Sequence, residues 1–414
     1  MPILLLAACG TEPNGDTAPE GDTAPEGDTA PEDDTAPEDE PHVPEALGDP
    51  LVIIEGEGDP LAGGFGSALT ATDMNGDGLD DAVLQFGAPS DNRRLVYAAR
   101  MGDLDSDGFH DLGVWVYTEW DEGSTQLVFG GAEPVKVDVS PVYRAAGDLD
   151  GDGFSDALAP QFSAYGGVAV RWGAPRNDDG SWTGENGPRW YGVEDYAYLG
   201  SELGAGDLDG DGLDELAMSA FHTRDGEGTV YLVQGSVERG VGNLPADDAD
   251  WTVEGDEQRA LIGRDTLVVA DLTGDGAEDL LVSSRQPGDL SETLDLVPSG
   301  RGGVLSEVAS TSLVNTPRFE VLSVDTADVD GDGYPDVAVS TRFHDPAFGM
   351  TGVWFGPLDP GVLPMDEPDL LRENQAVQFC TLGDFDGDGR ASLAIGEPQY
   401  VVDGGFIGAV LLLE

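Results

Sequence analysis

The nonapeptide Asp207–Glu215, DLDGDGLDE, places acidic side chains at positions 1, 3, 5 and 9 and a glycine at position 6. This spacing is typical of the start of an EF-hand calcium loop, which is completed by a bidentate Glu at position 12 on a following helix. Position 12 is Met218 here, which offers no hard oxygen ligand. The ligand set must therefore close at position 9.

The same pattern occurs seven times along the chain. The copies begin at aspartates and are DMNGDGLDD (Asp73), DLDSDGFHD (Asp103), DLDGDGFSD (Asp148), DLDGDGLDE (Asp207), DLTGDGAED (Asp271), DVDGDGYPD (Asp328) and DFDGDGRAS (Asp384). Position 12 is apolar in every copy, which argues against EF-hand and dockerin-like loops throughout.

Short apolar and β-branched runs flank each copy, as in LVVAD before and DLLVSS after the copy at Asp271. Such runs predict strands on both sides of the loop. A third strand follows, as in TVYLVQGS, and a fourth recurs ahead of the next unit, as in DWTVEGD. Four short strands per repeat predict an all-β fold, a β-propeller with the loops between strands 1 and 2 of each blade.

Seven units favour seven blades, and the segment Pro50–Asp59 is expected to supply the missing outer strand of the last blade and close the ring. The first unit is short, because Asp73 and Asp103 are only 30 residues apart. Six full blades plus a reduced one is the alternative.

The stretch Gly63–Ser90, GGFGSALTATDMNGDGLDDAVLQFGAPS, resembles the FG-GAP repeat of the integrin alpha-subunit propeller and of bacterial FG-GAP or VCBS proteins. Phe65-Gly66 and Gly87-Ala88-Pro89 bracket the loop in the family's order. The resemblance covers residues 50–414, with the loop as its most specific part. Other units keep the loop sequence but differ from the family's sequence pattern outside the loop.

Crowded carboxylates repel one another unless a cation neutralises them, and all-oxygen ligands at flexible distances suit Ca2+ better than Mg2+. We expect Ca2+ to stabilise the turns between strands, with direct contact to a ligand as the less favoured reading. The expected metal ligands, at positions 1, 3, 5, 7 and 9, are Asp73, Asn75, Asp77, Leu79, Asp81, Asp103, Asp105, Asp107, Phe109, Asp111, Asp148, Asp150, Asp152, Phe154, Asp156, Asp207, Asp209, Asp211, Leu213, Glu215, Asp271, Thr273, Asp275, Ala277, Asp279, Asp328, Asp330, Asp332, Tyr334, Asp336, Asp384, Asp386, Asp388 and Arg390.

Near the N-terminus, a short apolar run ends in Leu6-Ala7-Ala8-Cys9, which resembles the lipobox of bacterial lipoproteins. We interpret residues 1–9 as a signal remnant with Cys9 as the lipidated residue, and expect the true start to lie upstream, since no basic residue precedes the apolar run. Residues 10–48 contain acidic, Pro-rich GDTAPE repeats and are expected to form a disordered tether. Residues 50–414 are expected to form the propeller.

A formal net charge of -64, from 82 acidic and 18 basic residues, argues against nucleic-acid binding. No GxSxG elbow, phosphate loop or paired zinc-binding histidines occur, so no catalytic residue is assigned and a non-enzymatic role is expected. Cys380 is expected to be a buried hydrophobe rather than a nucleophile.

Two tryptophans in polar surroundings, Trp182 and Trp120, are candidates for stacking on a sugar or a protein. We expect a monomeric, lipid-anchored binding or adhesion module for an unknown protein or glycan ligand. Its expected place is the outer membrane or cell surface, with secretion as a further possibility. The alternative is a lectin-like or carbohydrate-active enzyme domain that uses the propeller channel.

Overall fold

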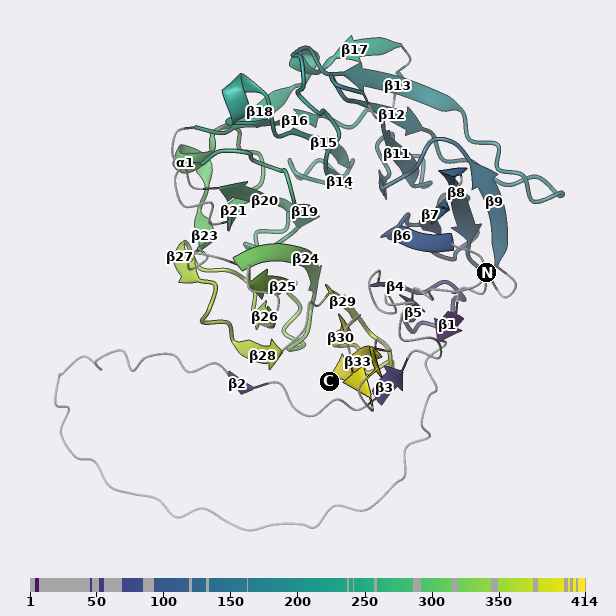
Figure 1. Ribbon diagram of the computed structural model, residues 1–414. Coiled ribbons are helices and arrows are strands. Elements are labelled where there is room, and N and C mark those ends of the chain that lie inside the picture. The colour runs from purple at the N-terminus through teal and green to yellow at the C-terminus, as the bar shows by residue number, and fades with distance from the viewer. Residues whose placement is uncertain are drawn as a thin grey trace, which may run out of the picture.

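The computed structural model describes residues 4–6, 45–46, 52–55, 69–84, 93–118, 121–131, 134–161, 163–236, 238–240, 242–256, 259–285, 292–314, 319–343, 349–374, 379–397, 401–402, 405–406 and 409–413. Antiparallel sheets are arranged in a ring (Figure 1), which confirms the all-β propeller. No helix among these residues is long and apolar enough to cross a membrane.

Six blades form the propeller, each with four antiparallel strands. The first contains β6 (Arg93–Arg100), β7 (Leu112–Thr118), β8 (Asp121–Phe129) and β9 (Val135–Val139). The second contains β10 (Ala145–Gly147), β11 (Asp156–Pro160), β12 (Gly167–Arg171) and β13 (Asn186–Tyr191). The third contains β14 (Leu203–Gly206), β15 (Glu215–Ala220), β16 (Thr229–Val233) and β18 (Trp251–Glu254).

The second half of the ring repeats this pattern. The fourth blade contains β19 (Leu267–Ala270), β20 (Asp279–Arg285), β21 (Glu292–Val297) and β23 (Thr311–Val314). The fifth contains β24 (Phe319–Ala327), β25 (Asp336–Phe343), β26 (Gly349–Trp354) and β28 (Leu370–Asn374). The sixth contains β29 (Phe379–Gly383), β30 (Ser392–Glu397), β33 (Ala409–Leu413) and β3 (Val52–Glu55), with the hairpin β31 (Val401–Val402) and β32 (Gly405–Phe406) between β30 and β33.

The expectation of a seven-bladed propeller is wrong. The unit that carries the Asp73 loop supplies only β4 (Leu69–Thr72) and β5 (Asp81–Leu84), which form a three-stranded sheet with β1 (Leu4–Leu6). The physical reason is length, because β6 of the first blade already begins at Arg93 and leaves no room for two further strands. The inner strand β4 lies between β29 and β6 and fills that part of the ring.

Ring closure by the N-terminal segment is confirmed. Strand β3 pairs antiparallel with β33, with Val52 opposite Leu412 and Glu55 opposite Ala409, so it is the outer strand of the sixth blade. This pairing removes an exposed sheet edge.

An additional outer strand, which the sequence did not indicate, lies parallel to the fourth strand in four blades. These strands are β17 (Asn243–Pro245), β22 (Gly303–Val304), β27 (Gly361–Pro364) and β2 (Glu45–Ala46). The first three belong to the connection between the third and fourth strands of the following blade. Each connection therefore ties one blade to its neighbour.

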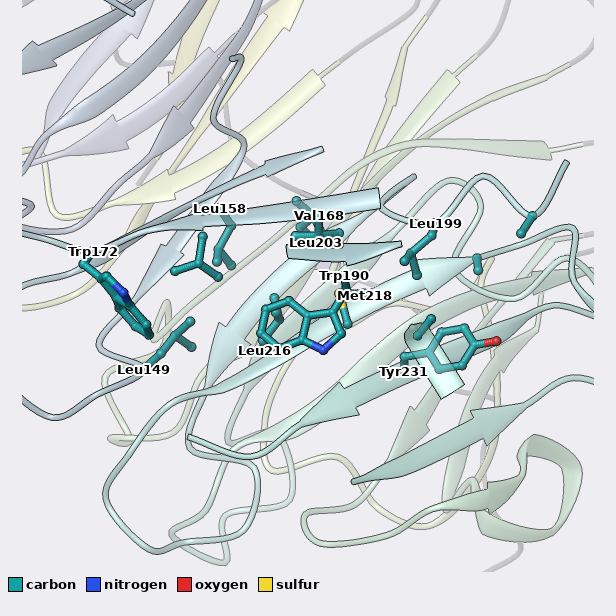
Figure 2. Close-up of a cluster of buried hydrophobic side chains, with 14 residues drawn as sticks. Leu149, Leu158, Val168, Trp172, Trp190, Leu199, Leu203, Leu216, Met218 and Tyr231 are labelled. Atoms are coloured by element: carbon teal, nitrogen blue, oxygen red, sulfur yellow. The ribbon is translucent and has the colours of Figure 1, made fainter. Parts of the chain in front are cut away.

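The core lies between blades. Figure 2 shows the cluster between the second and third blades, where Trp172, Trp190 and Met218 pack with leucines of both sheets. All six residues of β15 are buried, as expected for a strand covered on both faces. In the part of the chain that the structure describes, short helical turns lie in the connections between strands: η1 (Arg224–Gly226), η2 (Ala246–Asp248) and α1 (Leu305–Val308).

Arg100 on β6 spans the place where the three-stranded sheet is inserted. Its Nε donates to the carbonyl of Ala71 on β4 at 2.5 Å, and its Nη2 donates to the carbonyl of Leu382 on β29 at 2.8 Å. The same Nη2 lies 2.9 Å from Asp325 Oδ2 on β24. One side chain therefore connects four inner strands.

The substitution Arg100→Met should lower the free energy of unfolding by about 2 kcal/mol, because several hydrogen bonds to a charged group are lost together. Urea unfolding followed by tryptophan fluorescence measures the change. The matched control is Arg342→Met, which removes a single surface pair with Glu320 and should cost less than about 1 kcal/mol. Equal losses in both variants would contradict the bridging role.

Candidate metal centres

All seven loops lie between the first and second strands of their sheets, as predicted. They are residues 73–81, 103–111, 148–156, 207–215, 271–279, 328–336 and 384–392, and each is named here by its first residue. Because the strands are antiparallel, these loops all lie on the same face of the ring, here called the loop face.

The first and fifth positions build the turn itself. In the Asp207 loop, Asp207 Oδ1 accepts the N–H of Gly210 at 2.7 Å and Oδ2 accepts the N–H of Gly212 at 2.9 Å. Asp211 Oδ1 accepts the N–H of Leu213 at 3.0 Å. Gly212 has φ +89°, a conformation that favours glycine. These carboxylates therefore stabilise the loop by accepting hydrogen bonds from its backbone N–H groups.

The ninth position is the buried end of the loop. Asp156 Oδ2 accepts the N–H of Leu149 at 3.0 Å, and Oδ1 accepts the N–H of Gly173, beyond the third strand, at 2.8 Å. Asp111, Glu215, Asp279 and Asp336 make the same two kinds of bond. A Cβ at position 173 would lie 2.4 Å from Phe154 Cβ, which explains the glycine there. The ninth carboxylate therefore fastens the loop to the third strand.

Burial strongly perturbs these groups. It raises the pKa of Asp111 to about 8, of Asp156 and Glu215 to about 7, and of Asp81 and Asp336 to about 6. Ionised carboxylates in such positions need a neutralising cation.

Five loops bring three carboxylates together among the described residues, with one oxygen of each within 4.8 Å of the others. The groups are Asp103, Asp105 and Asp111; Asp148, Asp150 and Asp156; Asp207, Asp209 and Glu215; Asp328, Asp330 and Asp332; and Asp384, Asp386 and Asp388. The Asp73 and Asp271 loops carry Asn75 and Thr273 at the third position instead, and the Asp384 loop carries Ser392 at the ninth.

An unpaired oxygen supports the fit to a cation. Asp105 is only 6% exposed, and its buried Oδ1 has no hydrogen-bond partner. All donors in these groups are carboxylate oxygens, which are the ligands that Ca2+ prefers. The residues fit Ca2+, which would be held by the first, third, fifth and ninth positions and would neutralise the crowded charge.

Two arginines contact these loops from the following blade. Arg176 pairs with Asp105 and, at 2.6 Å, with Asp107, while its guanidinium lies 4.9 Å from the ring centre of Phe129. Arg239 pairs with Asp150 and Asp152 in the same manner. These arginines offset part of the carboxylate charge of two loops and link neighbouring blades.

The loops are also bonded to one another. The N–H at position 8 donates to the position 1 carbonyl of the neighbouring loop in six of the seven cases: His110 to Asp73, Ser155 to Asp103, Asp214 to Asp148, Glu278 to Asp207, Ala391 to Asp328 and Asp80 to Asp384, at 2.7–3.2 Å. Position 8 of the remaining loop is Pro335, which has no N–H. The sequence analysis assigned no role to position 8 and therefore missed this contact.

Acidic side chains at position 8 strengthen the link. Asp214 Oδ2 accepts the N–H of Asp148 at 2.8 Å, and Glu278 Oε2 accepts the N–H of Asp207 at 2.8 Å. Asp80 does the same for Asp384 at 2.9 Å, across the closure of the ring. The acidic residues at position 8 were the feature of the sequence that could have indicated this contact between loops.

The remaining predicted residues are placed as follows. Trp182 is 6% exposed and packs against Phe129 and Tyr143, with Arg171 over its ring, so its side chain belongs to the core between blades. Trp120 and Cys9 lie outside the described residues. Cys380 is 4% exposed, as predicted, and burial raises the pKa of its thiol to about 11.

Comparisons with known proteins agree with this geometry. The FG-GAP-like repeat family matches residues 271–339, and the FG-GAP repeat family matches residues 199–233. Integrin alpha-5 of Xenopus laevis is 32% identical over 180 residues, which are 40% of this chain and 15% of that protein. The chain carries FG-GAP repeats on an integrin-like β-propeller.

Two further relatives have similar coverage. Integrin alpha-4 of Xenopus laevis is 28% identical over 36% of this chain and 15% of the relative, and integrin alpha-PS2 of Drosophila melanogaster is 29% identical over 36% of this chain and 12% of the relative. The matched segments of this chain thus span only 12–15% of the length of these integrin alpha relatives. A structure of BBS1N in complex with ARL6DN aligns over 89% of this chain and 97% of that chain, with 12% identity and a TM-score of 0.40.

Calcium should raise the melting temperature, and the increase should be larger at pH 8 than at pH 5. The raised pKa values mean that the ion-free folded state keeps protons that the unfolded state releases above about pH 4, so its stability falls as the pH rises towards 8. Calcium needs the ionised carboxylates and reverses this loss. Thermal melts in EDTA and in calcium at both pH values measure this increase in melting temperature. Identical melting curves with and without calcium, together with no bound calcium by elemental analysis, would contradict the prediction.

The substitution Asp156→Ala should destabilise the protein by about 1–3 kcal/mol even in EDTA, because it leaves the buried N–H of Gly173 unpaired and leaves the N–H of Leu149 with only the carbonyl of Gly147 as acceptor. Asp211→Ala, at an exposed position of the next loop, is the control and should cost much less without calcium. Urea unfolding in EDTA measures both. A larger loss for Asp211→Ala would show that the ninth position has no structural role of its own.

Proposed function

We propose that the protein is a calcium-stabilised binding or adhesion module, presented at the cell envelope through lipid-modified Cys9 and the acidic tether of residues 10–48. The observation that carries the proposal is that loops with clustered carboxylates, which could bind cations, lie on one face of an integrin-like propeller. Ions held there stabilise blade contacts and leave the connections on the opposite face available for a protein or glycan ligand.

Binding is favoured over catalysis because the described carboxylates with raised pKa values have structural partners. Half of them are ninth-position residues bonded to backbone N–H groups. Glu292, whose pKa burial raises to about 7, is 1% exposed, pairs with Arg285 and accepts the N–H of Val321. These groups are engaged in holding the fold, and no catalytic role is assigned to them.

The mass of the N-terminal peptide tests the lipid anchor directly. Cleavage before Cys9 removes Leu4–Leu6, the residues of β1, so lipidation and the pairing of β1 with β5 exclude each other. The protein produced in a Gram-negative host from a gene that includes the expected upstream start should fractionate with membranes and give an N-terminal peptide that begins at a diacylated Cys9. Cys9→Ser should release it into the soluble fraction, whereas an unprocessed wild-type N-terminus would contradict the anchor.

Ligand binding should be measured with the full Cys9→Ser chain on a glycan array and, as coated beads, on cells. We expect binding in calcium and loss of binding in EDTA once the temperature exceeds the melting point of the ion-free protein. Beads coated with the thermally unfolded chain are the control for non-specific charge effects. Absence of binding to cells and glycans in calcium would remove the proposed function.

A further inference from the structure

Two of the seven loops already hold a positive charge beside the carboxylates that would bind calcium. In the Asp103 loop this charge is Arg176, which pairs with the carboxylates at the third and fifth positions. In the Asp148 loop it is Arg239, which pairs with the carboxylates at the same two positions. Each arginine follows the third strand of the next blade. The two loops are therefore neutralised in the same way.

The arginines contact oxygens that are not used by the turn itself. Asp107 Oδ1 accepts the N–H of Phe109 at 3.1 Å, and Asp107 Oδ2 lies 2.6 Å from Arg176 Nη2. Asp152 is bonded in the same way, with Oδ1 accepting a backbone N–H and Oδ2 paired with Arg239. A calcium ion held at the fifth position would need one of these oxygens. Arginine and calcium thus compete for the same atoms.

One guanidinium does not satisfy the whole Asp103 loop. Asp105 Oδ2 pairs with Arg176, whereas the buried Oδ1 of the same carboxylate has no hydrogen-bond partner among the described residues. The loop has four carboxylates and one paired arginine, so negative charge is left over. A divalent ion with several oxygen ligands would remove both deficits. Calcium is thus favoured in this loop, but it must displace Arg176 from two carboxylates.

Buried aromatic rings hold both arginines in place. The guanidinium carbon of Arg176 lies 4.9 Å from the ring centre of Phe129, and that of Arg239 lies 5.6 Å from the ring centre of Trp172. Trp172 belongs to the same core cluster as Leu149, a residue of the loop that Arg239 contacts (Figure 2). Cation–π contact adds to the charge attraction. Displacing either arginine therefore costs more than breaking an exposed ion pair.

The other loops lack this charge. In the Asp207 loop, the third-position carboxylate accepts a hydrogen bond at 3.0 Å from Nε2 of Gln234, a neutral amide. In the Asp271 loop, the fifth-position carboxylate accepts a hydrogen bond at 3.1 Å from the hydroxyl of Ser299. Among the residues that the structure describes, no arginine or lysine pairs with a carboxylate of the five remaining loops. A calcium ion would displace no basic side chain there.

A displaced Arg176 side chain has another place to go. A cavity of about 620 Å³ lies beside it and is lined by Asp105, Asp107, Asp178 and Asp179. Asp178 and Asp179 are exposed and belong to the same connection as Arg176. A rotation of the arginine side chain towards them would replace its lost carboxylate partners. Competition by calcium is therefore possible without unfolding the connection.

We propose that Arg176 and Arg239 are tethered counter-ions that compete with calcium, so that the Asp103 and Asp148 loops bind the ion more weakly than the loops without an arginine. At low calcium the arginines keep these loops neutralised and keep the first three blades linked. At higher calcium the ion replaces them. The proposal rests on the calcium binding of the proposed function, and it is independent of the ligand that the module binds.

Equilibrium dialysis with elemental analysis tests the competition on the full Cys9→Ser chain, from about 1 µM to 10 mM free calcium. The double variant Arg176→Gln, Arg239→Gln should bind two of its ions about tenfold more tightly, because the competing charges are removed. The matched control, Arg224→Gln with Arg342→Gln, makes the same change in net charge at pairs with glutamates away from the loops. Its binding curve should stay within about twofold of that of the parent chain.

Melting temperatures separate competition from a purely structural role. In EDTA the glutamine double variant should melt below the parent chain, because its loops lose their only positive charge. Saturating calcium should remove this difference, since the ion then neutralises the loops in both proteins. An equal lowering of the melting temperature in EDTA and in calcium, with an unchanged calcium-binding curve, would overturn the proposal.

The reciprocal variant Gln234→Arg guards against a folding defect in the glutamine double variant. It places an arginine beside the third-position carboxylate of the Asp207 loop and should weaken the binding of one ion about tenfold. Calcium binding that is identical in the parent chain, the glutamine double variant and Gln234→Arg overturns the proposal alone. If neither the parent chain nor any variant binds calcium, the calcium-stabilised module fails together with it.

Discussion

A buried carboxylate at the ninth position of a loop is the constraint on which each blade depends. It accepts one N–H from the start of its own loop and another from the residue beyond the third strand, as Asp156 does with Leu149 and Gly173. This fixes three strands relative to one another at the loop face. The same burial makes the charge costly, so the turn is most stable when the carboxylate is either protonated or neutralised by a cation.

Much of the fold could be predicted because the repeat is local. A nonapeptide flanked by β-branched runs determines two strands and the turn between them, and seven copies imply a ring. The closing strand at Val52–Glu55 was recognisable because the last unit lacks its fourth strand. The number of blades was not predicted correctly, since a loop at Asp73 does not guarantee that enough chain follows it to form four strands.

The contacts between blades could not be predicted, because they join residues that only the three-dimensional ring brings together. Arg176 lies about 70 positions along the chain from Asp105 and Asp107, and Asp80 contacts Asp384 of the neighbouring loop although 304 positions separate them in the sequence. Trp182 lies in a polar stretch of sequence and is nevertheless buried by Phe129 and Tyr143 of the neighbouring blade.

The pairing of β3 with β33 also sets the order in which the propeller can mature. Strand β3 leaves the ribosome before any complete blade, whereas its partner, Ala409–Leu413, is made after all the others. The early strand must therefore remain unpaired while the intervening blades assemble, which gives the closing step a very long sequence separation and makes it slow. Its apolar residues Val52, Ile53 and Ile54 are exposed to misassociation during that interval, and the long acidic segment before them supplies charge that opposes it.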